Sequence, residues 1–451
     1  MTPVASVYNE VSIHSRVHTM KWNKDTFALK GNLLYTPSPE KLVSLASHYL
    51  VCEGGKVSGA FPVLPERYKG ISVRDFGDSL IIPGFVDLHM HAPQYAMRGL
   101  GMDMELLQWL ESFTFPEEAR YADLLYAEKA YRIFAQDLKK SSIARACIFG
   151  TIHADATFLL MQLLEETGIV AAVGKVNMDV NCPDYYGEST MQSISETVRW
   201  IEASQERFQR IFPILTPRFA PVCSSGLMGE LAGLQQKYCL PLQSHLSENR
   251  AEGQWVQSLF PESRFYGEVY DRFGIFGSHG PTVMAHCVYS SPDEVALMKE
   301  RGVFIAHCPQ SNVNLASGIA PARSYLDGGQ RMGLGSDISG GFSLSGFRAI
   351  SDAIQMSKLF WRLQDTDKKP LSLSDAFYLA TKGGGAFFGK VGSFEEGYAF
   401  DVLVLDDTFL ASPARLDMVS RLERLVYLAG QDCICEKYVS GVKVWDAIED
   451  R

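Results

Sequence analysis

Two histidines separated by one residue, His89 and His91, end a buried apolar run that begins at Leu80. Alternate side chains of a β-strand point to the same face, so both imidazoles can reach one metal ion. An H-x-H pair alone is a weak signal, because two histidines at a strand end can equally be structural. The surroundings favour a functional interpretation, since the apolar stretch Pro83–Asp87 has no structural use for two imidazoles.

Three more candidate ligands, His245, His286 and Asp337, end other apolar runs. Taken singly, each histidine is better explained as a hydrogen-bonded core residue. Taken with His89 and His91, they amount to four imidazoles and one carboxylate, a set that suits Zn²⁺ or Fe²⁺. No cysteine belongs to the set, so a closed structural zinc site is not predicted. A site with one labile position would bind water and lower its pKa from about 15.7 to about 7.

Hydrolytic chemistry at such a site also needs groups that move protons. Glu248 lies three residues after His245, just beyond the end of the predicted strand, and can carry protons to and from a bound molecule. Asp337 can hold the metal and accept a proton from water. The alternative for Glu248 is a carboxylate in the first turn of a helix, where it would stabilise the helix N-terminus.

The number of metal ions also follows from the sequence. Barrels that bind two metals usually carry a carboxylated lysine at the end of the fourth strand. Here the fourth run ends at Arg218, which cannot be carboxylated, and Lys175 lies in the third run. A site for one metal ion is therefore predicted.

Eight apolar runs alternate with amphipathic segments between residues 80 and 340. The runs are Leu80–His91, Ala144–His153, Ala171–Asp179, Ile211–Pro217, Leu240–His245, Thr282–His286, Val303–His307 and Met332–Asp337. Continuous apolar runs are typical of parallel strands buried on both faces, and Leu227–Tyr238 and Pro292–Arg301 have helical periodicity. The pattern predicts an α/β fold, a (β/α)8 TIM-like barrel, whose active site lies at the carboxyl ends of its strands. His153, Asp179 and His307 also stand at these ends.

The two ends of the chain show a different pattern, with short alternating runs and turn signals. Examples are Thr26–Leu34, Asp401–Leu405 and Tyr438–Trp445, the last with Gly441 at a hairpin turn. We expect residues 1–78 and 390–451 to form one small flanking β-sandwich domain, and residues 79–389 to form the barrel. The connection 341–385 is expected to be helical, with Ala349–Leu363 and Leu373–Ala380 as its helices.

Composition excludes several classes of protein. The formal net charge is −10 and no run of Lys or Arg forms a basic stripe, so no nucleic-acid partner is expected. Met1–Val17 lacks the apolar core of a secretory signal, and no apolar stretch is long enough to span a membrane. The nine cysteines lack C-x-x-C spacing and indicate reduced thiols in a cytoplasmic protein. Cys433 and Cys435 are interpreted as alternate positions of a strand, with a weak metal site as the alternative.

Several motifs together resemble the amidohydrolase superfamily and, within it, the family of guanine deaminases. The motifs are Pro83–Tyr95, Leu106–Pro116, Thr151–Asp155, Gly174–Asp179, Thr216–Phe219, Gln243–Arg250, Met284–His286, Ala306–Asn312 and Gly333–Gly341. The H-x-H and Ser-Asp elements are common to the superfamily. The stretches FTFP, TPRF and SHLSEN are more particular to the guanine deaminases.

The resemblance implies a cytoplasmic homodimer that hydrolyses guanine to xanthine and ammonia with one zinc ion per subunit. Its implied zinc ligands are His89, His91, His245, His286 and Asp337. Its implied catalytic residues are Glu248 as proton shuttle, Asp337 as base, and His286, which steadies the nucleophile with Asp337. Its implied substrate-binding residues are His91, Gln94, Arg218, Phe219, His245, Glu248 and Asp337.

The implied substrate contacts are physically reasonable. Arg218 can donate to a purine carbonyl, Gln94 can pair with an amide-like ring edge, and Phe219 can stack on the base. Without the resemblance, these residues would be interpreted as a surface ion pair, a turn residue and a core aromatic. A loop carrying Trp109 and Phe113 is a candidate to close over the ligand.

Two alternatives remain open at this point. The first is a deaminase or hydrolase of the same barrel that acts on adenosine-like compounds, cytosine or a triazine. The second is an inactive barrel that serves as a scaffold, although such proteins usually lose metal ligands.

Overall fold

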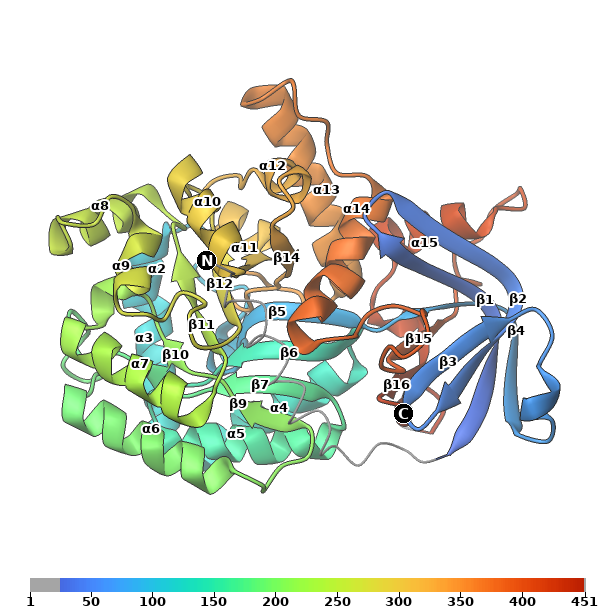
Figure 1. Cartoon of the computed structure of the whole chain (residues 1–451), viewed down its shortest axis with the longest axis horizontal. Coiled ribbons are helices and arrows are strands. Elements are labelled where there is room, and N and C mark those ends of the chain that lie inside the picture. The colour runs from blue at the N-terminus through green and yellow to red at the C-terminus, as the bar shows by residue number, and fades with distance from the viewer. Residues whose placement is uncertain (1–24, 450–451) are drawn as a thin grey trace, which may run out of the picture.

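The computed structural model describes residues 25–449. The first 24 residues of the predicted flanking domain, including Met1–Val17, lie outside this range, as do residues 450 and 451. Figure 1 shows two parts, a set of parallel strands surrounded by helices and a sheet made from both ends of the chain. Of the helices between residues 25 and 449, none has the length and apolarity needed to cross a lipid bilayer.

The parallel strands form two main four-stranded sheets. The first contains, in spatial order, β5 (Phe85–His91), β6 (Ile143–Phe149), β7 (Val170–Gly174) and β9 (Ile211–Pro213). The second contains β11 (Leu242–Leu246), β12 (Thr282–His286), β13 (Phe304–His307) and β14 (Arg331–Leu334). The short strands β8 (Val176–Asn177) and β10 (Thr216–Pro217) pair separately.

Backbone hydrogen bonds join the two sheets at both edges. On one side, Leu215 donates to the carbonyl of Pro241 and accepts from the amide of Gln243, each at 2.9 Å. On the other side, the amide of Asp337 donates to the carbonyl of His89 at 2.8 Å. The hydrogen bonding therefore continues from strand to strand, as expected for a mixed α/β fold of TIM-barrel type.

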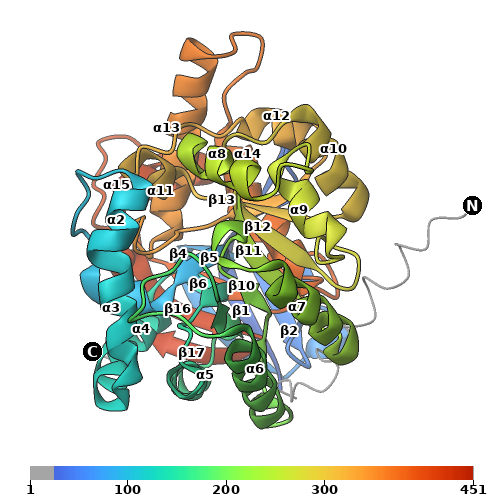
Figure 2. The same cartoon turned by 90° about the vertical axis from the view of Figure 1, so that its left-hand side faces the viewer.

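Helices cover the outside of these strands (Figure 2). They are α4 (Leu124–Lys140), α5 (Ala154–Thr167), α6 (Thr190–Ser204), α7 (Ser225–Tyr238), α8 (Arg250–Leu259), α9 (Tyr266–Arg272), α10 (Pro292–Arg301), α11 (Pro309–Asn314), α12 (Ala322–Asp327), α13 (Gly346–Leu363) and α14 (Leu373–Tyr378). A further helix, α15 (Met418–Leu428), packs against α13. Their ends follow local rules. In α10, Ser291 accepts from the amide of Glu294 at the start, and Gly302 ends the helix with a φ of 68°.

Both chain ends contribute strands to one seven-stranded sheet. In spatial order its strands are β17 (Val442–Asp446), β16 (Ile434–Val439), β15 (Val402–Leu405), β4 (Ser72–Pro83), β1 (Thr26–Ser38), β2 (Lys41–Glu53) and β3 (Lys56–Phe61). Side chains from several of these strands share one buried cluster, including those of Leu29, Leu50 and Val402. Gly441 lies at the turn between β16 and β17 with a φ of 76°.

The structure differs from the sequence prediction at one boundary. The run Leu80–His91 contains two strands, because Gly84 separates β4 from β5. Residues Leu80–Pro83 pair with β15 in the seven-stranded sheet, and only Phe85–His91 joins the parallel strands. A Cβ atom on Gly84 would lie 2.6 Å from the Cβ of Ala144, so close packing requires glycine at this crossing. Each of the other predicted runs contains a strand.

The segment that carries Trp109 and Phe113 is also not the predicted loop. It is helical, with α2 (Leu106–Trp109), a π-helical turn (Leu110–Thr114) and α3 (Phe115–Ala119) in succession. Trp109 is buried, and its indole N–H donates to the carbonyl of Leu100 at 3.0 Å. This segment is therefore a packed wall above the ends of the parallel strands.

Candidate active site

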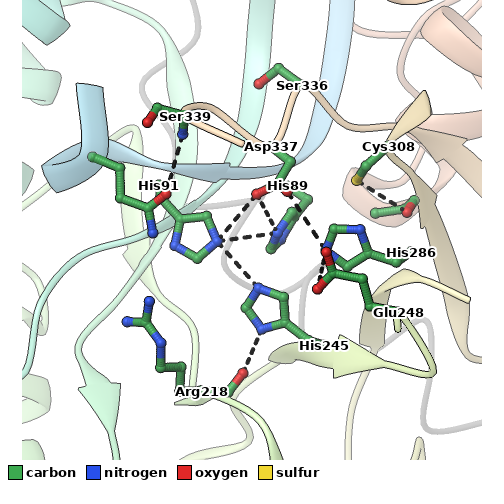
Figure 3. A network of polar contacts seen from close by, with 12 residues as sticks. His89, His91, Arg218, His245, Glu248, His286, Cys308, Ser336, Asp337 and Ser339 are labelled. Atoms are coloured by element: carbon green, nitrogen blue, oxygen red, sulfur yellow. Dashed lines mark hydrogen bonds and ion pairs between the residues drawn. The ribbon is translucent and has the colours of Figure 1, made fainter. Parts of the chain in front are cut away.

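Three imidazoles meet at the carboxyl ends of β5 and β11 (Figure 3). The Nε2 atom of His91 lies 3.3 Å from Nε2 of His89 and 3.3 Å from Nε2 of His245. His89 and His91 are buried, and His245 is partly exposed. The alternation of side chains along β5 brings its two histidines to one face, as the sequence predicts.

Asp337 and His286 complete the cluster from the ends of β14 and β12. Oδ1 of Asp337 lies 3.1 Å from Nε2 of His89 and 3.4 Å from Nε2 of His91, and Oδ2 lies 3.7 Å from Nε2 of His286. Asp337 and His286 have φ angles of 45° and 75°, in the left-handed region. Positive φ angles are uncommon for residues other than glycine, and they concentrate at functional sites.

Neighbouring groups fix the orientation of two of these rings. Nδ1 of His245 donates to the backbone carbonyl of Arg218 at 2.5 Å, and Nδ1 of His286 donates to Oδ1 of Asn312 at 2.9 Å. With the proton on Nδ1, the Nε2 lone pair of each ring points into the cluster. Hydrogen bonds of this kind commonly orient metal-binding histidines.

The donor atoms fit one divalent cation. Ligand atoms at about 2.1 Å from a tetrahedral zinc ion lie about 3.4 Å apart. Nε2 of His91 lies 3.3 Å from Nε2 of His89 and 3.3 Å from Nε2 of His245. The atoms of His89, His286 and Asp337 form a second, overlapping group. Nε2 of His286 is buried and has no hydrogen-bond partner among the described residues. Imidazole and carboxylate are ligand types of zinc and iron.

The environment keeps these groups in the protonation states that a cation requires. Burial lowers the pKa of His89, and lowers the pKa values of His91 and His245 well below the ordinary range. Burial alone would raise the pKa of Asp337, but His89 and His286 outweigh it, and the pKa lies below its ordinary value. His89, His91 and His245 therefore offer neutral imidazoles beside the ionised carboxylate of Asp337.

Glu248 lies beside the cluster and holds its proton, whereas Asp337 is ionised. Burial, assisted by the charge of Asp337, raises the pKa of Glu248 well above its ordinary value. One carboxyl oxygen of Glu248 lies 3.4 Å from Nε2 of His286, and the other accepts from the hydroxyl of Ser317 at 3.2 Å. A buried acid that holds its proton at neutral pH is suited to proton transfer.

One cavity connects the cluster with the predicted substrate-binding residues. It holds about 410 Å³ of empty space, including the part that is open to solvent. Its lining includes His91, Gln94, Arg218, Phe219, His245, Glu248, Glu252, His286 and Asp337, with an apolar wall of Leu106, Trp109, Leu110 and Leu315. Phe219 is buried and packs edge-on against Trp255, with ring centroids 6.0 Å apart. The cavity is therefore polar at the cluster and apolar on the side of α2.

Arg218 is not in a surface ion pair. Its guanidinium is buried and makes two hydrogen bonds with Glu118, at 2.5 Å and 3.1 Å. The sequence gives no signal for Glu118, because the motif Leu106–Pro116 ends two residues before it. An acid in the first turn of a helix normally indicates only stabilisation of the helix N-terminus.

Several other polar residues at strand ends stay outside the cluster. The carboxylate of Asp179 accepts from the amide and hydroxyl of Ser224 and so supports the start of α7. The ring of His153 packs near Tyr186, with centroids 5.9 Å apart. Burial lowers the pKa of His307 to about 4, and it belongs to neither candidate ligand group in the described part of the chain. Lys175 donates to Glu188 at 2.6 Å, away from the cluster.

Comparisons with known proteins identify the family of the chain. Residues 80–444 match the model of the Amidohydrolase family. The chain is 36% identical to guanine deaminase of Mus musculus over 456 residues, which cover 98% of this chain and 97% of the relative. It is 38% identical to guanine deaminase of Dictyostelium discoideum over 381 residues, which cover 83% of this chain and 84% of the relative.

A solved structure is similar over nearly the whole fold. It is the crystal structure of guanine deaminase from C. acetobutylicum with guanine bound in the active site. The two structures superpose with a TM-score of 0.91 at 48% sequence identity, covering 93% of this chain and 100% of the other. The chain therefore belongs to the amidohydrolase family and, within it, to the family of guanine deaminases.

Proposed function

We propose that this protein hydrolyses guanine to xanthine and ammonia. The observation that carries the proposal is that one cavity is lined both by the cluster around Asp337 and by Gln94, Arg218 and Phe219. These groups supply what a purine needs, namely donors for a carbonyl, an amide partner and an aromatic face. Because the chain belongs to the family of guanine deaminases, we infer that this purine is guanine.

We propose one zinc ion per subunit. The residues that would hold it are His89, His91, His245, His286 and Asp337. When bound, such a cation supplies hydroxide at neutral pH, because it lowers the pKa of water from about 15.7 to about 7. The orphan Nε2 of His286 and the spacing of the imidazoles support this assignment. Iron fits the same ligand types.

The protein's own groups would move the protons. Asp337, held as a carboxylate by the neighbouring histidines, takes a proton from the attacking water, and His286 steadies that water. Glu248, which enters with its proton, transfers it to ring nitrogen N3 and then, as a carboxylate, takes the proton of the C2 hydroxyl and passes it to the amine that leaves C2. The proton held by Asp337 returns to Glu248, so both carboxyl groups regain their starting states. The sum is guanine plus water giving xanthine plus ammonia.

The remaining pocket residues would orient the base. Arg218 donates to the purine carbonyl, Gln94 pairs with the amide-like edge, and Phe219 stacks on the ring. His91 and His245 line the floor of the pocket near the reacting carbon. The apolar wall around Trp109 excludes water from the opposite side.

We also propose that the parallel strands form one closed (β/α)8 barrel and that the two chain ends form a flanking β-sandwich domain. The continuous hydrogen bonding at Leu215 and Asp337 and the shared seven-stranded sheet support this division. We place the boundary at Gly84 instead of residue 79, because Leu80–Pro83 pair with β15. The second boundary stays near residue 390.

The proposed location is the cytoplasm. Among the described residues, Cys147, Cys223, Cys287 and Cys308 are buried free thiols, which suits a reducing compartment. The homodimer implied by the family resemblance stays a prediction.

Steady-state rates on guanine, adenine, adenosine, cytosine and a triazine test the proposed substrate. We expect kcat/KM to be highest for guanine, with xanthine and ammonia formed in equal amounts. Negligible activity on guanine beside rapid turnover of another compound would overturn the proposal. Absence of turnover in metal-loaded protein on every substrate would support the scaffold alternative.

A further inference from the structure

The carboxylate of Glu118 is fully buried, and both of its oxygens are saturated with hydrogen bonds. Oε1 accepts from Nε2 of Gln94 at 2.9 Å and from Nη2 of Arg218 at 3.1 Å. Oε2 accepts from Nη1 of Arg218 at 2.5 Å and from the hydroxyl of Tyr186 at 2.8 Å. A carboxylate has about four acceptor positions, so none is left for a ligand.

These contacts determine how two pocket residues face the cavity. Gln94 uses its amide nitrogen on Glu118, while its amide oxygen accepts from the backbone N–H of Ser339 at 3.3 Å. Both the nitrogen and the oxygen of the Gln94 amide therefore have hydrogen-bond partners, and these partners fix the orientation of the amide. The guanidinium of Arg218 is held at two nitrogens by Glu118, and the ring of Phe115 lies 5.1 Å away from its central carbon. Because these contacts with Glu118 and Phe115 fix the plane of the guanidinium, they also fix the direction of the N–H groups of Arg218 that Glu118 does not use.

Glu118 also balances charge. The guanidinium of Arg218 is buried at the wall of a cavity that is proposed to receive a neutral base. Without a counter-charge, a buried guanidinium would strongly attract anionic ligands. The Glu118 carboxylate makes the pair neutral overall, so an anionic ring loses this attraction while a neutral carbonyl can still accept a hydrogen bond.

We propose that Glu118 is a positioning and specificity-determining residue of this pocket. It holds Arg218 and Gln94 in the orientation that receives a neutral purine, and it cancels the charge of Arg218 so that anionic heteroaromatic compounds are excluded. The inference rests on the proposed function, because Arg218 and Gln94 are the proposed contacts of the base.

The test compares Glu118→Gln with Asp401→Asn. Asp401 is a matched control because it pairs with buried Arg145 through hydrogen bonds of 2.6 Å and 3.3 Å, and neither residue lines the cavity. KM and kcat for guanine and the metal content are measured for each variant. Binding of pyridine-3-carboxylate is measured by calorimetry without guanine.

We expect Glu118→Gln to raise KM for guanine and to tighten pyridine-3-carboxylate binding, each about tenfold or more, at unchanged metal content. Asp401→Asn should leave both quantities unchanged. The double variant Glu118→Gln/Arg218→Met should lose the gain in carboxylate binding, because the uncompensated cation is gone. A merely structural role of Glu118 would not make one class of ligand bind more tightly.

Glu118→Asp separates charge from geometry and provides a second variant should the first fail to fold. It keeps the negative charge but is shorter, so KM should rise without tighter carboxylate binding. Unchanged KM and unchanged carboxylate affinity in the Glu118 variants, or equal shifts in Asp401→Asn, would overturn the inference. Failure of the wild-type protein to convert guanine would instead overturn the proposed function, and the carboxylate measurement would still report on Glu118.

Discussion

The backbone carbonyl of Arg218 accepts the Nδ1 proton of His245 at 2.5 Å, while the side chain of Arg218 lines the cavity. One residue therefore contributes to two parts of the site through different atoms. Its main chain orients a candidate metal ligand, and its guanidinium faces the proposed substrate. These two roles can be separated by changing the side chain alone.

Arg218→Met should retain the metal and lose the substrate. The backbone carbonyl that orients His245 remains, whereas the donors for the purine carbonyl are removed. We expect kcat/KM for guanine to fall by about two orders of magnitude or more, with metal content unchanged. Stability should fall by about 3–5 kcal/mol, because the buried Glu118 loses its partner. Loss of metal in this variant would contradict the separation of roles.

Glu248→Gln should reduce catalysis without releasing the metal. Glutamine has nearly the same shape but cannot carry a proton, and Glu248 is not among the proposed ligands. We expect kcat to fall by about 10² to 10⁴-fold, as measured by xanthine formation in protein of verified metal content. A kcat within a factor of a few of wild type would show that another group moves the proton.

Asn312→Leu should weaken metal binding. It removes the acceptor for Nδ1 of His286, so the ring loses its fixed orientation. We expect metal affinity to fall about 10–100-fold in a titration with buffered zinc. Asn177→Leu is the control, since the buried side-chain amide of Asn177 donates to Ser193 and Thr197. Equal loss of affinity in both variants would contradict a specific effect on His286.

Lys437 should make stability depend on pH. Its ammonium is buried and donates to the carbonyls of Leu138, Ser141 and Ile143 at 2.9–3.1 Å. Burial lowers the pKa of Lys437 from 10.5 to about 7. The folded state therefore binds this proton more weakly than the unfolded state, and stability increases as the pH rises from 7 toward 10.5.

Lys437→Met lacks this dependence and serves as the comparison. Between pH 7 and pH 9, the free energy of unfolding of the wild type should rise relative to the variant by about 2 kcal/mol. Parallel denaturation curves at the two pH values give the difference. A constant difference between the proteins across this range would show that Lys437 titrates near its ordinary pKa in the fold.

The cluster could be predicted from sequence because each of its members ends a continuous apolar run. Strand periodicity brings His89 and His91 to one face, and parallel strands bring their carboxyl ends together. The position of Glu118 follows from no such local rule. Its partners Gln94, Tyr186 and Arg218 are 24, 68 and 100 residues away, so only the folded chain reveals the network. Likewise, the division of Leu80–His91 depends on the close approach of Ala144 to Gly84, which the apolar pattern does not encode.

We propose that His89, His91, His245, His286 and Asp337 hold a metal ion that guanine hydrolysis requires. Xanthine formation should be measured in purified protein, in protein stripped by a chelator, and in stripped protein given one equivalent of zinc per subunit. We predict that stripping abolishes activity and that stoichiometric zinc restores it. Full guanine deamination by protein with no measurable bound metal would contradict the account.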